Sequence, residues 1–115
     1  MAHIILDFGS VTLNAELFDT GVAQGVHALL PRTLNLTRWG DEVYGALPVA
    51  IDTENPVPHI PAGGIAYTNN GNYLCIFFGQ QPAWPVEYIG QIQGNTWELL
   101  VGAQSLEHVT ISLAR

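Results

Sequence analysis

Cys75, Glu42 and Tyr44 are the side chains in this chain that could support chemistry in a cleft. Cys75 lies within an apolar run, residues 73–78. A reactive thiolate needs a nearby histidine or cationic group and some exposure, and the sequence neighbours of Cys75 are all apolar. We therefore expect a buried, unreactive thiol. A hydrolase that uses Glu42 or Cys75 is an alternative.

Glu42 and Tyr44 alternate along one predicted strand, so both side chains should lie on the same face of it. The adjacent carboxylate, Asp41, should point the other way, and the two acids are not expected to act together. Glu42 and Tyr44 are therefore candidates for a polar wall of a binding groove. The alternative is that Glu42 is solvated and Asp41 forms a turn.

The four histidines, His3, His27, His59 and His108, form no His-x-His or His-Glu-x-x-His pattern. His3 and His108 could meet if the first and last strands are neighbours. A lone strand histidine is usually structural, however, so we predict no metal site. The chain has no glycine-rich loop of the Walker or dinucleotide type, and no cofactor is predicted.

Composition excludes several function classes. The 115 residues, treated as one domain over 1–115, carry a net charge of −7 from three Lys and Arg against ten acids. All three cations are arginines, too few and too scattered for a nucleic-acid footprint. No apolar run approaches the roughly 20 residues of a membrane span, and no signal peptide is apparent. The single cysteine favours a reducing setting, so we expect a cytoplasmic protein.

The elements that must position these residues are mostly short strands. Alternating or apolar runs predict strands at residues 3–8, 11–18, 32–38, 42–49, 65–67, 73–78, 86–93 and 108–113. A helix is expected over residues 21–30, capped near Asp19 and Thr20 and ended by Pro31. Residues 96–102 fit either a short strand or a helix. Many short strands with one clear helix favour a closed barrel, in a mainly β fold.

The predicted strand at 73–78 raises a question about its second face. Its residues, Tyr-Leu-Cys-Ile-Phe-Phe, do not alternate between apolar and polar types. A barrel lumen can cover only one face of such a strand. The other face must meet a helix, a loop, another subunit or a ligand.

Two longer stretches carry a resemblance to a known family. The run from "ALLPRT" to "RWGDEVYGALPV" and the run "GGIAYTNNGNYLCIFFGQQP" are similar to the signatures of a small uncharacterised family of bacterial and archaeal cyclophilin-like proteins. "VTLNAELFDT", "EYIGQIQGN" and "HVTISLAR" resemble strands of true cyclophilins. The chain departs from the family at Thr68-Asn69, where the family has Trp-Pro, and at Gly63-Gly64, where it has Gly-Asp.

The resemblance implies a closed antiparallel eight-stranded cyclophilin-like barrel with one or two short helices and an outer groove. Residues Leu74, Ile76 and Phe78 would then face the lumen, and Tyr73, Cys75 and Phe77 the groove. Cys75 falls where cyclophilins place a phenylalanine of the substrate pocket, Thr68 and Asn69 fall on backbone that contacts peptide, and Trp84 lies close to a pocket tryptophan. The candidate ligand-binding residues are Glu42, Tyr44, Tyr67, Thr68, Asn69, Tyr73, Cys75, Phe77 and Trp84.

Cyclophilins twist a prolyl amide with an arginine carried in a Phe-His-Arg-Val-Ile-Pro strand. The matching strand here, residues 42–48, has no arginine. We therefore expect a binding domain for a small molecule or peptide, without prolyl isomerase activity. An unconventional isomerase is an alternative, as is an assembly module, because related domains occur in multi-subunit amidohydrolases. A homodimer that uses the same aromatic residues also stays open.

Overall fold

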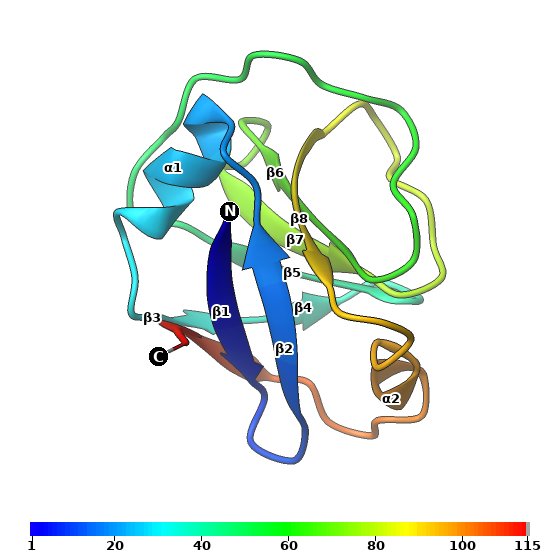
Figure 1. The fold of residues 1–115 in the computed structure, drawn as a ribbon. Coiled ribbons are helices and arrows are strands. Elements are labelled where there is room, and N and C mark those ends of the chain that lie inside the picture. Colours follow the sequence, from blue (N-terminus) through cyan, green and yellow to red (C-terminus); the bar gives the residue numbers. More distant parts are fainter. Residues whose placement is uncertain (115) are drawn as a thin grey trace.

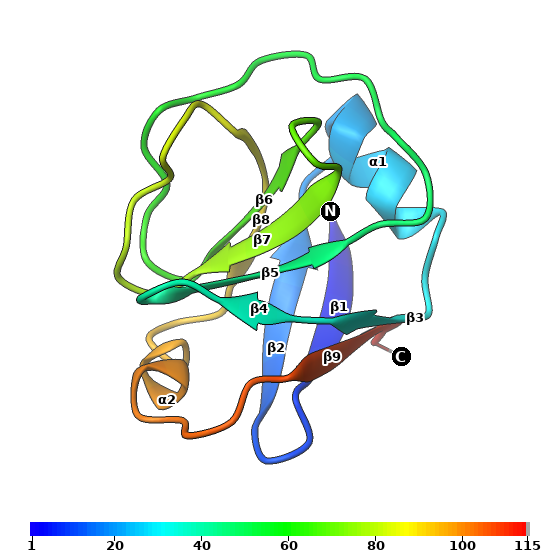
Figure 2. The same ribbon diagram turned by 180° about the vertical axis from the view of Figure 1, so that it is seen from behind.

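Within residues 1–114, nine strands form one antiparallel sheet that curls into a nearly closed barrel (Figures 1 and 2). The structure is a computed structural model, and it describes residues 1–114. The strand order is β3-β9-β1-β2-β8-β6-β7-β5-β4, and every pairing between neighbours is antiparallel. The expected mainly β barrel is confirmed.

Turns and caps set the bounds of these elements. The strands are β1 Ala2–Asp7, β2 Thr12–Leu17, β3 Arg32–Asn35, β4 Thr37–Arg38, β5 Glu42–Ala46, β6 Gly64–Thr68, β7 Tyr73–Phe77, β8 Glu87–Ile92 and β9 His108–Leu113. The helices are α1 Gly21–His27 and α2 Glu98–Val101. The ambiguous segment at 96–102 is therefore helical.

The predicted strand at residues 32–38 is two strands, and this break closes the barrel. β3 pairs with β9 and β4 pairs with β5, so one bent segment joins both ends of the strand order. Between them, the Leu36 amide donates to the Glu107 carbonyl at 2.8 Å. Gly45 of β5 passes so close that an added Cβ would lie 2.6 Å from the Asn35 carbonyl oxygen. The count is therefore nine strands rather than eight, because one expected strand is divided.

The two helices lie near opposite ends of the barrel (Figure 1). The side chain of Thr20 accepts a hydrogen bond from the Ala23 amide, which caps α1 as expected. The helix buries Val22, Ala23 and Val26, and it ends at His27, earlier than the predicted Leu30.

The barrel lumen is filled by aliphatic side chains. On β7, Leu74, Ile76 and Phe78, the residue that follows it, belong to the main buried cluster, together with alternate residues of β1, β2 and β9. The expected lumen face of this strand is confirmed.

A second buried cluster lies on the outer face of β6, β7 and β8. It comprises Ile60, Ala66, Cys75, Phe77 and Val86. The chain itself supplies part of this cover, since loop 47–63 crosses the face and Val57 forms a β-bridge with Val86. Loops 47–63 and 78–86 run side by side in both ribbon views (Figures 1 and 2).

His3 and His108 do not meet, although the first and last strands are neighbours. β1 does pair with β9, but Ile4 lies opposite Leu113 and Asp7 opposite Thr110. The antiparallel register therefore puts the two histidines at opposite ends of the strand pair. Within residues 1–114, no group of three or more His, Cys, Asp or Glu side chains is arranged to hold a metal ion. Neither helix of this part of the chain is long and apolar enough to cross a membrane.

Candidate functional site: a pocket on the outer face of the barrel

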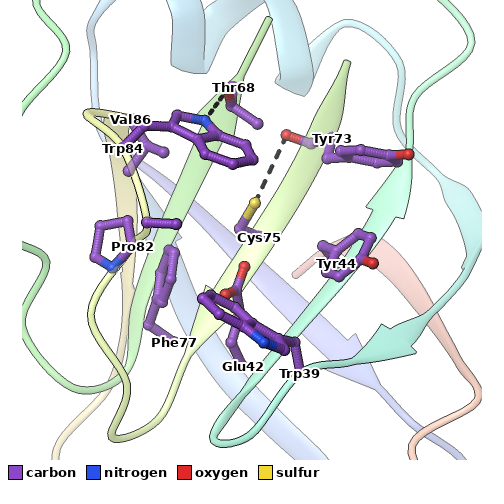
Figure 3. Close-up of a pocket in the computed structure, with 11 residues that line it drawn as sticks. Trp39, Glu42, Tyr44, Thr68, Tyr73, Cys75, Phe77, Pro82, Trp84 and Val86 are labelled. Carbon is purple, nitrogen blue, oxygen red and sulfur yellow. Dashed lines mark hydrogen bonds between the residues drawn. The ribbon is translucent and has the colours of Figure 1, made fainter. Parts of the chain in front are cut away.

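The outer face of β5 and β7 carries a pocket of about 300 Å³, bordered by the turn before β5 and by loop 78–86 (Figure 3). Its lining is largely apolar and aromatic. The lining residues are Trp39, Glu42, Tyr44, Thr68, Tyr73, Cys75, Phe77, Pro82, Ala83, Trp84 and Val86. A volume of this size is at the lower end of the range for small-molecule sites.

Most of the predicted site residues lie together at this pocket. Tyr73, Cys75 and Phe77 point outward from β7, with Cys75 and Phe77 buried at its floor. Glu42 and Tyr44 project from β5, which pairs with β7 and sets Glu42 opposite Phe77 and Tyr44 opposite Cys75. The face of β7 that carries Tyr73, Cys75 and Phe77 therefore lies at this pocket.

Tyr67 and Asn69 do not line the pocket. Tyr67 is fully buried in the lumen cluster, where its hydroxyl donates to the Asn72 side chain and accepts from the Ile51 amide. Adjacent strand residues point to opposite faces, so the placement of Thr68 at the pocket puts Tyr67 in the lumen. Asn69 is exposed in the turn after β6.

Trp39 belongs to the pocket but was not among the predicted site residues. It lies in the turn between β4 and β5, where its amide donates to the Glu42 carbonyl at 2.8 Å. This turn places the indole on the pocket lining, as it does Glu42 (Figure 3). The sequence offered only an aromatic residue in an expected turn, Trp39-Gly40-Asp41, next to the candidate Glu42. The structure adds that this tryptophan is 50% exposed, although it is a large apolar residue.

Trp84 forms the opposite side of the pocket. Its indole is 45% exposed, yet its Nε1 donates to the Thr68 hydroxyl at 2.9 Å. That bond fixes a loop side chain against the end of β6. Figure 3 shows Trp84 and Trp39 on opposite sides of the pocket, with Cys75 between them.

Glu42 is a buried carboxyl group, 6% exposed, on the pocket wall. Burial raises its pKa from 4.5 to about 7, because an apolar site disfavours the charged form. Hydrogen bonding with the Cys75 thiol offsets part of that shift. Near neutral pH the group therefore exists in both protonation states.

Cys75 is unsuited to nucleophilic chemistry. Burial raises the pKa of its thiol well above the usual range, and the charge of Glu42 raises it further. The sulfur also makes a long contact, 4.0 Å, with the Tyr73 carbonyl oxygen. Because the thiolate is the reactive form, the setting favours an inert thiol.

Arginine does not line the pocket within residues 1–114. Arg38 is close in sequence, but its guanidinium donates to the carbonyls of Gly40 and Ala103, both at 2.9 Å. It lies 5.3 Å from the ring centre of Phe78, a lumen residue, and 3.8 Å from Asp41. The pocket thus has hydrogen-bonding groups and one carboxyl group, but no cation.

The nearly closed antiparallel barrel agrees with the fold that the sequence resemblance implied. A family model described as "Cyclophilin-like" matches residues 2–112, so the chain belongs to that family. No curated protein matches the chain significantly in sequence.

Two solved structures share the fold. The hypothetical protein AF2241 from Archaeoglobus fulgidus is 28% identical, with a TM-score of 0.79; the match covers 98% of this chain and 95% of that one. McbB, solved in complex with tryptophan, is 12% identical, with a TM-score of 0.78. That match covers 95% of this chain but 44% of McbB, and at this identity it establishes the fold alone.

Proposed function

We propose that this protein is a binding domain that holds a small molecule in the outer pocket, without prolyl isomerase activity. The observation that carries the proposal is the pair of half-exposed indoles, Trp39 and Trp84, on opposite sides of a hollow with a buried floor. Large aromatic side chains left exposed around a concave apolar site are typical of ligand recognition.

Two further observations support a ligand. The hydrogen bond from Trp84 to Thr68 holds one wall in place before any ligand arrives, which lowers the entropic cost of binding. The neighbour McbB was solved with tryptophan, a molecule of suitable size for such a pocket. A peptide that offers one apolar side chain to the pocket is the close variant of this proposal.

The experiment is a titration of the ¹⁵N-labelled protein with small aromatic probes such as indole and phenol, followed by NMR. Shifts should concentrate on Tyr44, Tyr73 and the indole N–H of Trp84. Trp84→Ala should weaken binding at least about tenfold, because it removes one wall of the pocket. Leu99→Ala, which truncates an exposed apolar residue on α2, is the matched control and should bind as before.

Solution mass separates the proposal from its rival. If the protein is an obligate dimer and Trp84→Ala dissociates it, the aromatic face is a subunit interface and the proposal fails. Shifts that spread over the surface, or that persist unchanged in Trp84→Ala, would also overturn it.

A further inference from the structure

The pocket joins aromatic rings with a single carboxyl group. Five rings line it, from the turn before β5, from β5 and β7, and from loop 78–86; they are Trp39, Tyr44, Tyr73, Phe77 and Trp84. Tyr44 and Tyr73 pack edge to face, with ring centres 4.9 Å apart. Figure 3 shows these two on one side and Phe77 on the other. The face of an aromatic ring carries negative charge density and attracts cations.

Glu42 is a buried acid for which residues 1–114 place no cation in the pocket lining. Only 6% of the residue's surface is exposed. No Lys, Arg or His of residues 1–114 lines the pocket. The closest arginine in sequence, Arg38, is engaged by Gly40, Ala103 and Asp41. A buried carboxylate without a counter-ion is unfavourable, so a ligand that supplied a positive charge would relieve it.

We propose that the pocket binds a small organic cation, an alkylated ammonium group on an apolar body, with Glu42 as counter-ion and the aromatic rings as a cage. This inference rests on the proposed function and names the chemical class of its ligand. Attraction of a cation to an aromatic ring is strongest where the ring and the cation are shielded from water. A metal ion would not find enough ligands here, since Glu42 and the Cys75 thiol are the ligating groups of the lining.

Cation binding should be coupled to the protonation of Glu42. The other titratable groups that face it are the thiol of Cys75, on the paired strand, and the phenols of Tyr44 and Tyr73. Burial moves the pKa of Cys75 further above neutrality, whereas that of Glu42 is about 7. The ionised carboxylate is the form that binds the cation, so affinity should rise with pH up to about 7 and then level off.

Two probes of matched shape test the inference: phenyltrimethylammonium, whose charge does not titrate, and tert-butylbenzene, its neutral counterpart. At pH 8 the cation should bind at least about tenfold more tightly. Between pH 8 and pH 5.5 its affinity should fall more than about tenfold, while that of the neutral probe stays within about twofold. Both are measured by NMR titration of the full chain.

Two variants distinguish the effect of the Glu42 charge on cation binding from the effect of the protein's net charge. Glu42→Gln should reduce the preference for the cation at least about fivefold, with the neutral probe still bound; the aromatic cage, which the variant keeps, accounts for what remains. Asp41→Asn removes the same charge one residue away, outside the pocket lining, and should retain the preference. Thermal unfolding checks that both variants fold.

The outcomes distinguish the two proposals. Equal affinity for both probes, or a preference that Glu42→Gln leaves unchanged, overturns the cation inference and leaves the proposed function standing. Failure of both probes and of the uncharged aromatics to bind overturns both.

Discussion

The two faces of β7 are both covered, but by different kinds of structure. The lumen face, with Leu74 and Ile76, packs against aliphatic residues from most strands of the barrel. The outer face, with Cys75 and Phe77, packs against two loops and opens into a pocket. Both Ile76 and Cys75 are buried, at 0% and 4% exposure, so exposure alone does not distinguish the faces.

What distinguishes the two faces is chemistry. The lumen cluster is mostly aliphatic, and its one phenol, Tyr67, is hydrogen-bonded to Asn72 and Ile51. The outer pocket is rich in aromatic rings and contains the carboxyl group of Glu42, whose pKa burial raises to about 7. A core built for stability avoids such a group, because neutralising or charging it in an apolar site costs free energy. The lumen therefore holds the fold together, and the different chemistry of the outer face supports the proposed ligand site there.

Truncating one side chain on each face of β7 should give the largest difference in the free energy of unfolding. Ile76→Ala should lower the free energy of unfolding by about 2–5 kcal/mol, because it leaves a cavity in closed packing. Cys75→Ala, one residue away, should cost about 1 kcal/mol or less, because it removes a single atom beside an existing hollow. Urea unfolding of both variants measures the difference. Losses of equal size would show that the outer face is packed as tightly as the lumen.

Glu42→Gln should stabilise the protein in a pH-dependent way. The folded-state pKa of about 7 is above the ordinary 4.5, so the unfolded chain releases this proton first as pH rises. Wild-type stability should therefore fall between about pH 4.5 and pH 7, by up to about 3 kcal/mol from this group. The variant lacks that loss and should be more stable at pH 8 by about 1–3 kcal/mol, with little difference near pH 4.5.

Melting temperatures of the two proteins across this pH range provide the measurement. Asp41→Asn is the control for net charge, because that neighbouring residue lies outside the pocket lining. A wild type as stable as Glu42→Gln at pH 8 would contradict the raised pKa.

Local patterns in the sequence were enough to predict most of the fold. Alternation and turns located the strands, and Thr20 located the start of α1. The break at Leu36 was not predicted, because alternation continues through it. It depends on closure of the barrel, which sends β3 and β4 to different partners.

The site was predictable where strand alternation decides it. The apolar run predicted cover on both faces of β7, and the resemblance to cyclophilins indicated which face is the outer one. Tyr67 was included with its segment although alternation turns it inward. Trp39 was missed because its place depends on the turn that leads into β5. Whether Glu42 is buried could not be predicted from the sequence either, because its burial depends on the pairing of β5 with β7, which lies far along the chain.

The smallest expected effect concerns catalysis on the outer face. We expect no acceleration of prolyl-peptide isomerisation at micromolar protein. An isomerase must lower a rotation barrier of about 20 kcal/mol by stabilising a twisted amide, which requires a donor aimed at its nitrogen. Arg38 is directed to carbonyls outside the pocket, and the indole N–H of Trp84 is bonded to Thr68.

An NMR exchange assay on a short Ala-Pro peptide measures this rate, with an active cyclophilin as the positive control. The matched variant is Arg38→Ala. In its presence the peptide should isomerise at the same rate as with the wild type and as with no protein. A wild-type rate comparable to that of the control, lost in Arg38→Ala, would mean that this arginine leaves its contacts with Gly40 and Ala103 to reach the substrate. In that case the outer face would be a catalytic groove, and its contrast with the lumen would be one of activity as well as of packing.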